Sequence, residues 1–179
     1  MQSKKYTMNA AVIAPGDILL FYHPRGVELV ISFLTKSSFY HVAIALNQHE
    51  LIEAVASGVI RSALETKRGK RFLVISPRSK DAARAAVVWA KSKIGDGYDP
   101  ADLVSIALDR IFAHLHVYFA RKGRFTCGEF VATAYKQAGS NLIPNVNPQD
   151  VVPADFARLL PRKVRSTFFG ANSLGLRTP

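Results

Sequence analysis

The stretch FTCGEFVATAY, residues 125–135, contains the only cysteine of the chain and predicts the helix around which we expect the fold to form. Thr126, followed three residues later by Glu129, is the pattern of a capping box, in which two side chains satisfy free N–H groups at a helix start. Cys127 is then the first helical residue, and Gly139 ends the helix. Apolar residues recur at helical spacing, at positions 127, 130, 131, 134, 135 and 138. We therefore predict that Cys127 lies on the buried face of a helix.

The start of a helix is also a chemically distinctive place for a thiol. The positive end of the helix dipole favours the thiolate, which is the form that attacks carbonyl groups. Gly128 carries no side chain, so we expect it to leave the next peptide N–H open to a substrate oxygen, as an oxyanion hole requires. The alternative is a purely structural Cys127, because free cysteine is among the residue types that are most often buried.

A catalytic thiol needs a base, and the base needs a partner that orients it. His41 is the candidate base, because it lies within YHVAIAL (40–46), which predicts a strand. Ala43 and Ala45 share its face, and we expect these small residues to leave space there for a helix terminus and a substrate. For His41 taken alone, a packed core histidine is the alternative. The other histidines lie in predicted turns or in an apolar segment, at positions 23, 49, 114 and 116.

The next predicted strand, LIEAV (51–55), carries Glu53 between apolar neighbours. Burying such a carboxylate without a partner is costly. If Asn47 to His49 form a loop with an odd number of residues, Glu53 becomes the diagonal neighbour of His41 on one face, within reach of its ring. A loop with an even number would put the two side chains on opposite faces and break the pairing.

The remaining patterns indicate an α+β fold, because strands come early and helices come late. ILLFY (18–22) and FLVIS (72–76) predict two more strands, and residues 81–94 predict a helix that Gly95 ends. Ala82, Ala86, Trp89, Ala90 and Ile94 are expected to share its buried face. Residues 27–35 favour a short helix, and Asp99-Pro100 is typical of the start of another.

Composition limits the functional classes. The chain has 179 residues, enough for one domain with a sizeable core. A single cysteine excludes an internal disulfide and a cysteine-rich metal site. The net charge of +11 is spread over short basic groups at 67–71, 121–124 and 162–165. This distribution favours a solvated basic surface and peripheral contact with anionic surfaces. No motif of specific nucleic-acid binding stands out.

The apolar segments do not indicate a membrane protein or a cleaved leader. AAVIA near the N-terminus is too short for the core of a signal peptide and is stopped by Pro15-Gly16. The apolar region 103–119 is interrupted by Asp109, Arg110 and two histidines, so we do not expect it to span a bilayer. A cytoplasmic location is the default expectation, with export by a signal-independent route left open.

Several landmarks, in this order, resemble the permuted NlpC-type, papain-like cysteine hydrolases of the YiiX/YebB group. They are PGDILLF, FLTKSSFYHVAIAL, LIEAVASGV, IGDGYD, FTCGEFVATAYKQAG and VVPADFARLLP, and they run from about Pro15 to Pro161. The resemblance implies a circularly permuted papain-like fold, with an antiparallel sheet packed against helices that include the cysteine helix. It implies a single hydrolase domain over 1–165, with its core at about 13–161, and a C-terminal tail over 166–179.

The resemblance also assigns roles to residues. It implies Cys127 as nucleophile, His41 as base and Glu53 as the third member, with no metal or cofactor. Tyr98 in GDGYD matches an oxyanion-assisting tyrosine of the family. Tyr135 shares the stripe of Cys127, but eight residues along a helix is about 12 Å, so we expect it in the core. The sequence Cys-Gly-Glu-Phe departs mildly from the Cys-Ser-Glu-Leu that is common in the family.

Three functions remain open from the sequence. The leading hypothesis is a cysteine peptidase or amidase that cleaves an amide bond in a peptide, most plausibly a cell-wall (peptidoglycan) peptide, through a thioester. The second is a lipid acyl hydrolase or acyltransferase of the lecithin:retinol acyltransferase type, for which the apolar segments 27–34 and 103–119 would suit a membrane surface. The third is a non-catalytic binding module. An even hairpin loop, or a Cys127 thiol that points away from His41, would favour that third function.

Overall fold

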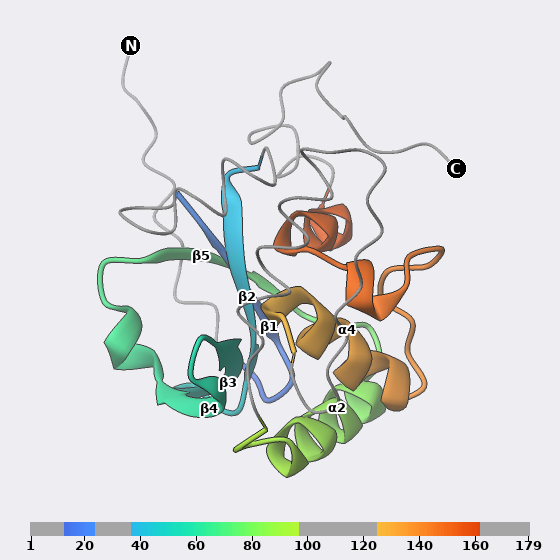
Figure 1. Cartoon of the computed structure of the whole chain (residues 1–179), viewed down its shortest axis with the longest axis horizontal. Helices are drawn as coiled ribbons and strands as arrows, with labels where there is room; N and C mark the ends of the chain where they lie inside the picture. Colours follow the sequence, from blue (N-terminus) through green and yellow to red (C-terminus); the bar gives the residue numbers. More distant parts are fainter. Residues whose placement is uncertain (1–12, 24–36, 97–124, 162–179) are drawn as a thin grey trace.

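The computed structural model describes residues 13–23, 37–96 and 125–161 (Figure 1). Its centre is a five-stranded antiparallel sheet with strand order β4-β3-β2-β1-β5. The strands are β1 (Ile18–Tyr22), β2 (Phe39–Ala45), β3 (Glu50–Val55), β4 (Gly58–Ala63) and β5 (Arg71–Ile75). The helices are α2 (Lys80–Ser92) and α4 (Cys127–Gln137), with 3-10 turns η1 (Leu64–Lys67), η2 (Pro148–Asp150) and η3 (Pro153–Leu159). The predicted α+β class and the antiparallel sheet packed against helices are confirmed.

Four strands lie where the sequence predicts them, within one residue at each end, whereas β4 was not predicted. β4 is an edge strand, and its second half alternates between half-buried and exposed residues. The sequence of this strand, GVIRSA, contains only a short apolar run, which is too weak a signal to predict a strand. β4 matters for the site because it carries Ser62.

The helix α4 begins as predicted. The Glu129 N–H donates to Thr126 Oγ1, and the Thr126 N–H donates to the Glu129 carboxylate, so the capping box is complete. The predicted buried stripe of this helix is also confirmed, since Cys127, Phe130, Val131, Ala134 and Tyr135 are buried. This helix start fixes the position of Cys127.

The helix α2 is shorter than predicted. It ends at Ser92, so the helical period does not continue to Ile94, and this side chain is 43% exposed. The expectation that Ile94 belongs to the buried face was therefore wrong. The alanines of the predicted face are buried as expected, at positions 82, 86 and 90, and Trp89 packs against the core half-buried.

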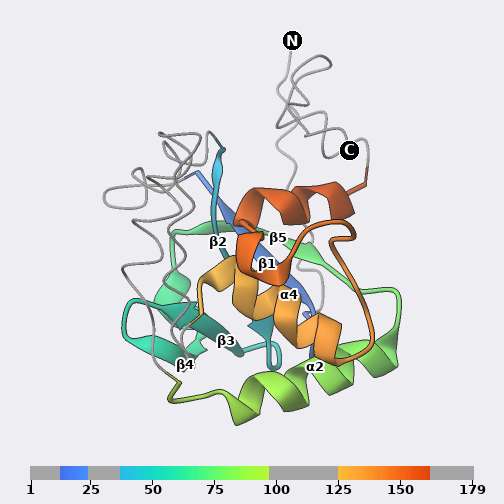
Figure 2. The ribbon, with the colours of Figure 1, turned by 45° about the vertical axis from the view of Figure 1, so that its right-hand side comes forward.

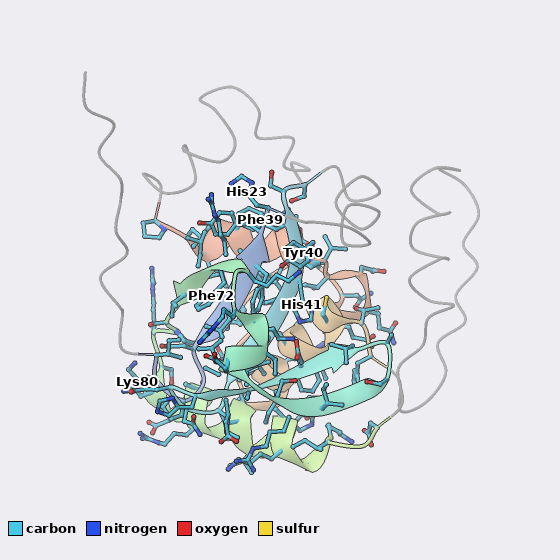
Figure 3. The ribbon with its side chains drawn as sticks, turned by 90° about the vertical axis from the view of Figure 1, so that its left-hand side faces the viewer. His23, Phe39, Tyr40, His41, Phe72 and Lys80 are labelled. Atoms are coloured by element: carbon cyan, nitrogen blue, oxygen red, sulfur yellow. The ribbon has the colours of Figure 1, made fainter. Side chains whose placement is uncertain are left out.

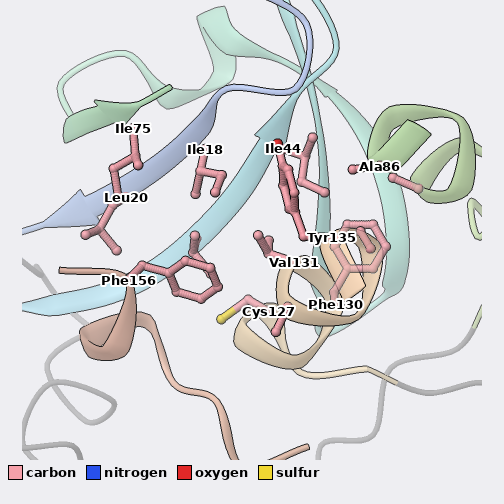
Figure 4. Close-up of a cluster of buried hydrophobic side chains, with 14 of the residues drawn as sticks. Ile18, Leu20, Ile44, Ile75, Ala86, Cys127, Phe130, Val131, Tyr135 and Phe156 are labelled. Atoms are coloured by element: carbon pink, nitrogen blue, oxygen red, sulfur yellow. The ribbon is translucent and has the colours of Figure 1, made fainter. Parts of the chain in front are cut away.

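The core is divided between the two faces of the sheet. Both helices cover one face, as two views of the ribbon show (Figures 1 and 2). On this face, Leu20 of β1 and Ile44 of β2 belong to one buried cluster with Val131 and Tyr135 of α4 (Figure 4). The opposite face carries a smaller cluster, formed by Leu19, Phe21, Tyr40, Ala43, Ala45 and Leu51.

The turn before β1 ties the two helices to the sheet. Asp17 is buried, and its carboxylate accepts a hydrogen bond from the Ala14 N–H. Gly16 has a φ of 86° and lies so close to Ala83 of α2 that a side chain would not fit. The buried Tyr135 hydroxyl donates to the Gly16 carbonyl oxygen. These contacts anchor α4 and α2 to the start of β1, and the prediction that Tyr135 belongs to the core is confirmed.

The first turn of α4 packs unusually close to the segment that follows η2. A Cβ atom built on Gly128 would lie 2.1 Å from the Val151 carbonyl oxygen and 3.1 Å from Val152 Cα. These are backbone atoms, so no side-chain rotation can relieve the clash. A glycine is therefore required here for the helix start to take its place.

We predict that Gly128→Ala destabilises the protein, although alanine is the better helix former by about 1 kcal/mol. Overpacking against backbone is expected to cost about 1–3 kcal/mol and to outweigh that gain. Denaturant unfolding of the variant measures the difference, and a stabilised variant would contradict the packing described here. Gly139→Ala is the control, because open space surrounds Gly139 and only its φ of 75° opposes the substitution.

Some expectations lie outside the described residues. They concern the helices expected at 27–35 and from Asp99, the apolar region 103–119 and the tail 166–179. Within the ranges that are described, no helix combines the length and the hydropathy needed to cross a membrane.

Candidate active site

The β2–β3 hairpin sets the positions of the first two site residues. Ile44 pairs with Ile52 and Ala45 with Leu51, and the Leu46 N–H donates to the Glu50 carbonyl oxygen. The loop is therefore Asn47 to His49, the odd loop that the pairing of His41 with Glu53 requires. Continued along the strands, this register puts Glu53 opposite Ala43, one diagonal step from His41. The two side chains meet, with His41 Nε2 2.7 Å from Glu53 Oε2.

An irregularity in β2 lies next to His41. Phe21 of β1 pairs with His41, but the next residue, Tyr22, pairs with Phe39, so Tyr40 is an extra residue in β2. In such a β-bulge two residues of one strand oppose one residue of its neighbour. The Phe21 ring accordingly contacts both Tyr40 and His41, at centroid distances of 6.4 and 5.5 Å. The same Phe21 ring also contacts Phe72, at a centroid distance of 5.4 Å (Figure 3 labels Tyr40, His41 and Phe72).

Glu53 is fully buried and is held by three side chains from three elements. Besides His41, the Ser62 hydroxyl of β4 donates to Glu53 Oε1 at 2.6 Å. Lys67 Nζ, at the end of η1, donates to the same oxygen at 2.6 Å. Burial alone would raise the pKa of Glu53, but the contacts with His41, Lys67 and Ser62 outweigh it and lower the pKa to about 2. Glu53 is therefore ionised at neutral pH.

His41 is influenced by two acidic side chains. Its Nε2 is bound to Glu53, and the Cys127 side chain also interacts with the ring. Burial lowers the pKa of His41, but the interactions with Cys127 and Glu53 outweigh burial and raise it to about 9. At neutral pH the ring is therefore protonated. Its side chain is 16% exposed.

The helix that carries Cys127 packs on a different face of the sheet than the sequence suggested. The body of α4 packs on the face of the sheet that carries Val42 and Ile44, whereas Ala43 and Ala45 belong to the opposite cluster. The expectation that the two alanines leave space for the helix was therefore wrong. The β2–β3 pairs lie at residues 44–45 of β2, and His41 lies beyond them. His41 therefore lies past the part of β2 that pairs with β3, although it still pairs with Phe21 of β1.

The surroundings of Cys127 combine a packed side and a helix terminus. Cys127 is 9% exposed and its sulfur lies at the border of the core cluster, toward Phe156 (Figure 4). Among the described residues, neither the Cys127 N–H nor the Gly128 N–H has a hydrogen-bond acceptor. The direction of a Gly128 side chain is filled by Val151, so packing already requires this glycine. An oxyanion role for its N–H stays a prediction.

The other polar candidates do not join the site or lie elsewhere. Tyr98 lies outside the described residues. Tyr135 is occupied by its bond to Gly16, and burial, together with the charge of Asp17, raises its pKa. His49 is exposed in the hairpin loop. In the part of the chain that the structure describes, no group of three or more His, Cys, Asp or Glu residues is placed to hold a metal ion.

Two residues of the site were missed from the sequence. Lys67 lies in the basic group 67–71, which was interpreted as solvated surface, yet it forms an ion pair with a buried carboxylate. Ser62 lies on the strand that was not predicted. The one available signal was the cost of burying Glu53, which calls for partners beyond a single histidine but does not say where they come from.

Comparisons with known proteins do not identify the chain. Neither a scan against models of protein families nor a search of curated proteins finds a match. The functional assignment therefore depends on the site itself and on the motifs quoted above.

We predict that the stability contributed by the Glu53 carboxylate is present above about pH 4.5 and is lost as the pH falls toward 2. The pKa of Glu53 in the folded state lies below the unfolded value of 4.5, so protonation of Glu53 at low pH favours the unfolded state. The difference in unfolding free energy between the wild type and Glu53→Gln should shrink by about 3 kcal/mol over this range. Urea unfolding at a series of pH values measures it.

Glu50→Gln is the matched control on the same strand. Glu50 pairs with Arg61 at the surface, where ion pairs contribute little, so its pH dependence should be much weaker. The unfolding free energies of Glu53→Gln and Glu50→Gln are each compared with that of the wild type. If both differences depend on pH to the same extent, the lowered pKa of Glu53 would be contradicted.

Proposed function

We propose that this protein is a cysteine hydrolase that cleaves amide bonds of peptides through a thioester on Cys127. The observation that carries the proposal is the bond between His41 and the buried Glu53, together with the interaction with Cys127 that helps to raise the pKa of His41. This order of nucleophile, base and orienting carboxylate is the arrangement that activates a thiol. The motifs that resemble the permuted NlpC-type hydrolases support the same three roles.

The resting form in this proposal is a thiolate–imidazolium pair. The raised pKa of His41, about 9, favours the protonated ring at neutral pH. The helix start stabilises the negative charge on the sulfur. Glu53 holds Nε2, so that the proton on Nδ1 faces the sulfur.

Acylation then follows from this pair. The Cys127 sulfur attacks the carbonyl carbon, a C–S bond forms, and the carbonyl electrons move to the oxygen. Backbone N–H groups of the first turn of α4 are the proposed donors to this oxyanion. The C–N bond breaks as the His41 imidazolium gives its proton to the leaving nitrogen, which leaves a thioester and an amine.

Deacylation restores the pair. Neutral His41 takes a proton from a water molecule as its oxygen attacks the thioester carbonyl. The C–S bond breaks, the acid product leaves, and Cys127 is again a thiolate beside an imidazolium. No metal or cofactor takes part in this proposal.

A peptide amide, with a cell-wall peptide as the leading candidate, is the substrate class we propose. The lipid alternative depended on segments 27–34 and 103–119, which lie outside the described residues. One condition that would favour a non-catalytic module is not met among the described residues, because the hairpin loop is odd.

We predict that His41→Ala lowers kcat/KM for peptide amide hydrolysis by about 10²–10⁴, the usual contribution of a general acid–base group. Cys127→Ala should abolish turnover. His49→Ala is the matched control, because this histidine is exposed in the neighbouring loop and touches none of the three residues. A peptide library that includes peptidoglycan stem peptides provides the substrates, and mass spectrometry of stopped reactions detects acyl adducts on Cys127.

The outcomes separate the candidate functions. Acyl adducts from peptides support the proposal, whereas adducts from phospholipids or acyl esters alone would replace it with the lipid function. Equal activity of the wild type and Cys127→Ala, or no adduct with any substrate, would contradict catalysis by Cys127.

A further inference from the structure

We propose that Lys67 is a positioning residue that neutralises Glu53 and thereby keeps the Cys127–His41 pair in its thiolate–imidazolium form. The inference rests on the proposed function, because it assigns a role within the same site. Lys67 acts only through Glu53, and we expect it to contact neither the substrate nor the reacting atoms.

The contacts place Lys67 at the far end of a linear array of charged groups. Lys67 Nζ lies 2.6 Å from Glu53 Oε1, while His41 Nε2 lies 2.7 Å from the other oxygen, Oε2. The lysine side chain is 21% exposed and the glutamate side chain 1%. The carboxylate thus bridges two cations that are both partly exposed, Lys67 at 21% and His41 at 16%, while the carboxylate itself is buried.

The charge balance of this array explains why the lysine matters. With Lys67 present, the thiolate, imidazolium, carboxylate and ammonium groups sum to zero. Without Lys67, the same protonation state would leave one net negative charge in a buried site, which is costly. The site can relieve this charge by taking up a proton, and the thiolate of Cys127 is the group that would accept it, since His41 is already protonated.

A neutral pair of Glu53 and Lys67 can therefore hold the imidazole in place without adding net charge. The groups that face Glu53 come from every described element around it: His41 from β2, Ser62 from β4 and Lys67 from η1. Ser62 is uncharged, so Lys67 is the one described cation besides His41 in contact with this carboxylate.

The test is the rate of Cys127 alkylation by iodoacetamide as a function of pH, in the full chain. In Lys67→Met we expect the acid midpoint of the profile to move up by about one pH unit, as for removal of a nearby, partly buried charge. Below the midpoint, alkylation should be about tenfold slower than in the wild type. Lys67→Arg keeps the charge and should keep the wild-type midpoint.

A double variant separates this role from a structural one. In Glu53→Gln/Lys67→Met the third member is neutral, as the intact pair is, so we expect the acid midpoint to return close to the wild-type value. This variant also leaves neither charge buried without a partner, so it stays informative if Lys67→Met alone fails to fold. Lys80→Met is the control for loss of a surface charge, since Lys80 is exposed and lies away from His41 (Figure 3).

The outcomes distinguish the two levels of the proposal. An unchanged midpoint in Lys67→Met, or a double variant shifted as far as Lys67→Met, would overturn the role of Lys67 while leaving the hydrolase proposal intact. A wild-type profile with the midpoint of an ordinary thiol, about 8.5, would instead overturn the proposal that Cys127 is activated.

Discussion

The buried carboxylate of Glu53 is the constraint on which the site depends. An ionised glutamate with no exposed surface is tolerated only when its oxygens are bound by donors, and here they are bound from β2, β4 and η1. These partners come from separate strands and a turn, so the carboxylate fixes the relative positions of the elements that carry them. The same bonds hold the His41 ring by Nε2, and Cys127 and Glu53 together raise the pKa of this histidine.

The rest of the fold brings the thiol to that ring. The turn at Gly16 connects β1 to both helices, and the close approach of Gly128 to Val151 sets the start of α4. The β-bulge at Tyr40 places His41 beside Phe21, at the end of β2 that extends past its pairing with β3. The candidate residues, a cysteine on a helix, a histidine on a strand and a glutamate on the next strand, thus all lie on regular elements, which hold a site more precisely than loops do.

Local patterns predicted much of this arrangement. The capping box identified Cys127 as the first helical residue, and the parity of the Asn47–His49 loop correctly put His41 and Glu53 on one face. Both inferences depend on backbone geometry over a few residues. The α+β class and four of the five strands followed from hydrophobic patterning in the same way.

Contacts between distant segments could not be predicted from such patterns. Lys67 resembles any surface lysine in a basic run, and only the fold brings it to Glu53. The position of α4 on the face opposite Ala43 depends on packing across the whole sheet, and the need for Gly128 depends on a backbone segment more than twenty residues away. In each case, side-chain chemistry was visible in the sequence, but its partner was not.

The most direct test of the central claim is the ultraviolet absorbance of the Cys127 thiolate as a function of pH, with Cys127→Ser as the blank. The claim is that Cys127 and His41 form an ion pair at neutral pH. It predicts that the wild type shows thiolate absorbance at pH values well below about 8.5, the pKa of an ordinary thiol. In His41→Ala, this absorbance should be absent at those lower pH values. Absorbance that appears only near pH 8.5 in both proteins would contradict the ion pair and leave Cys127 as a residue of the core.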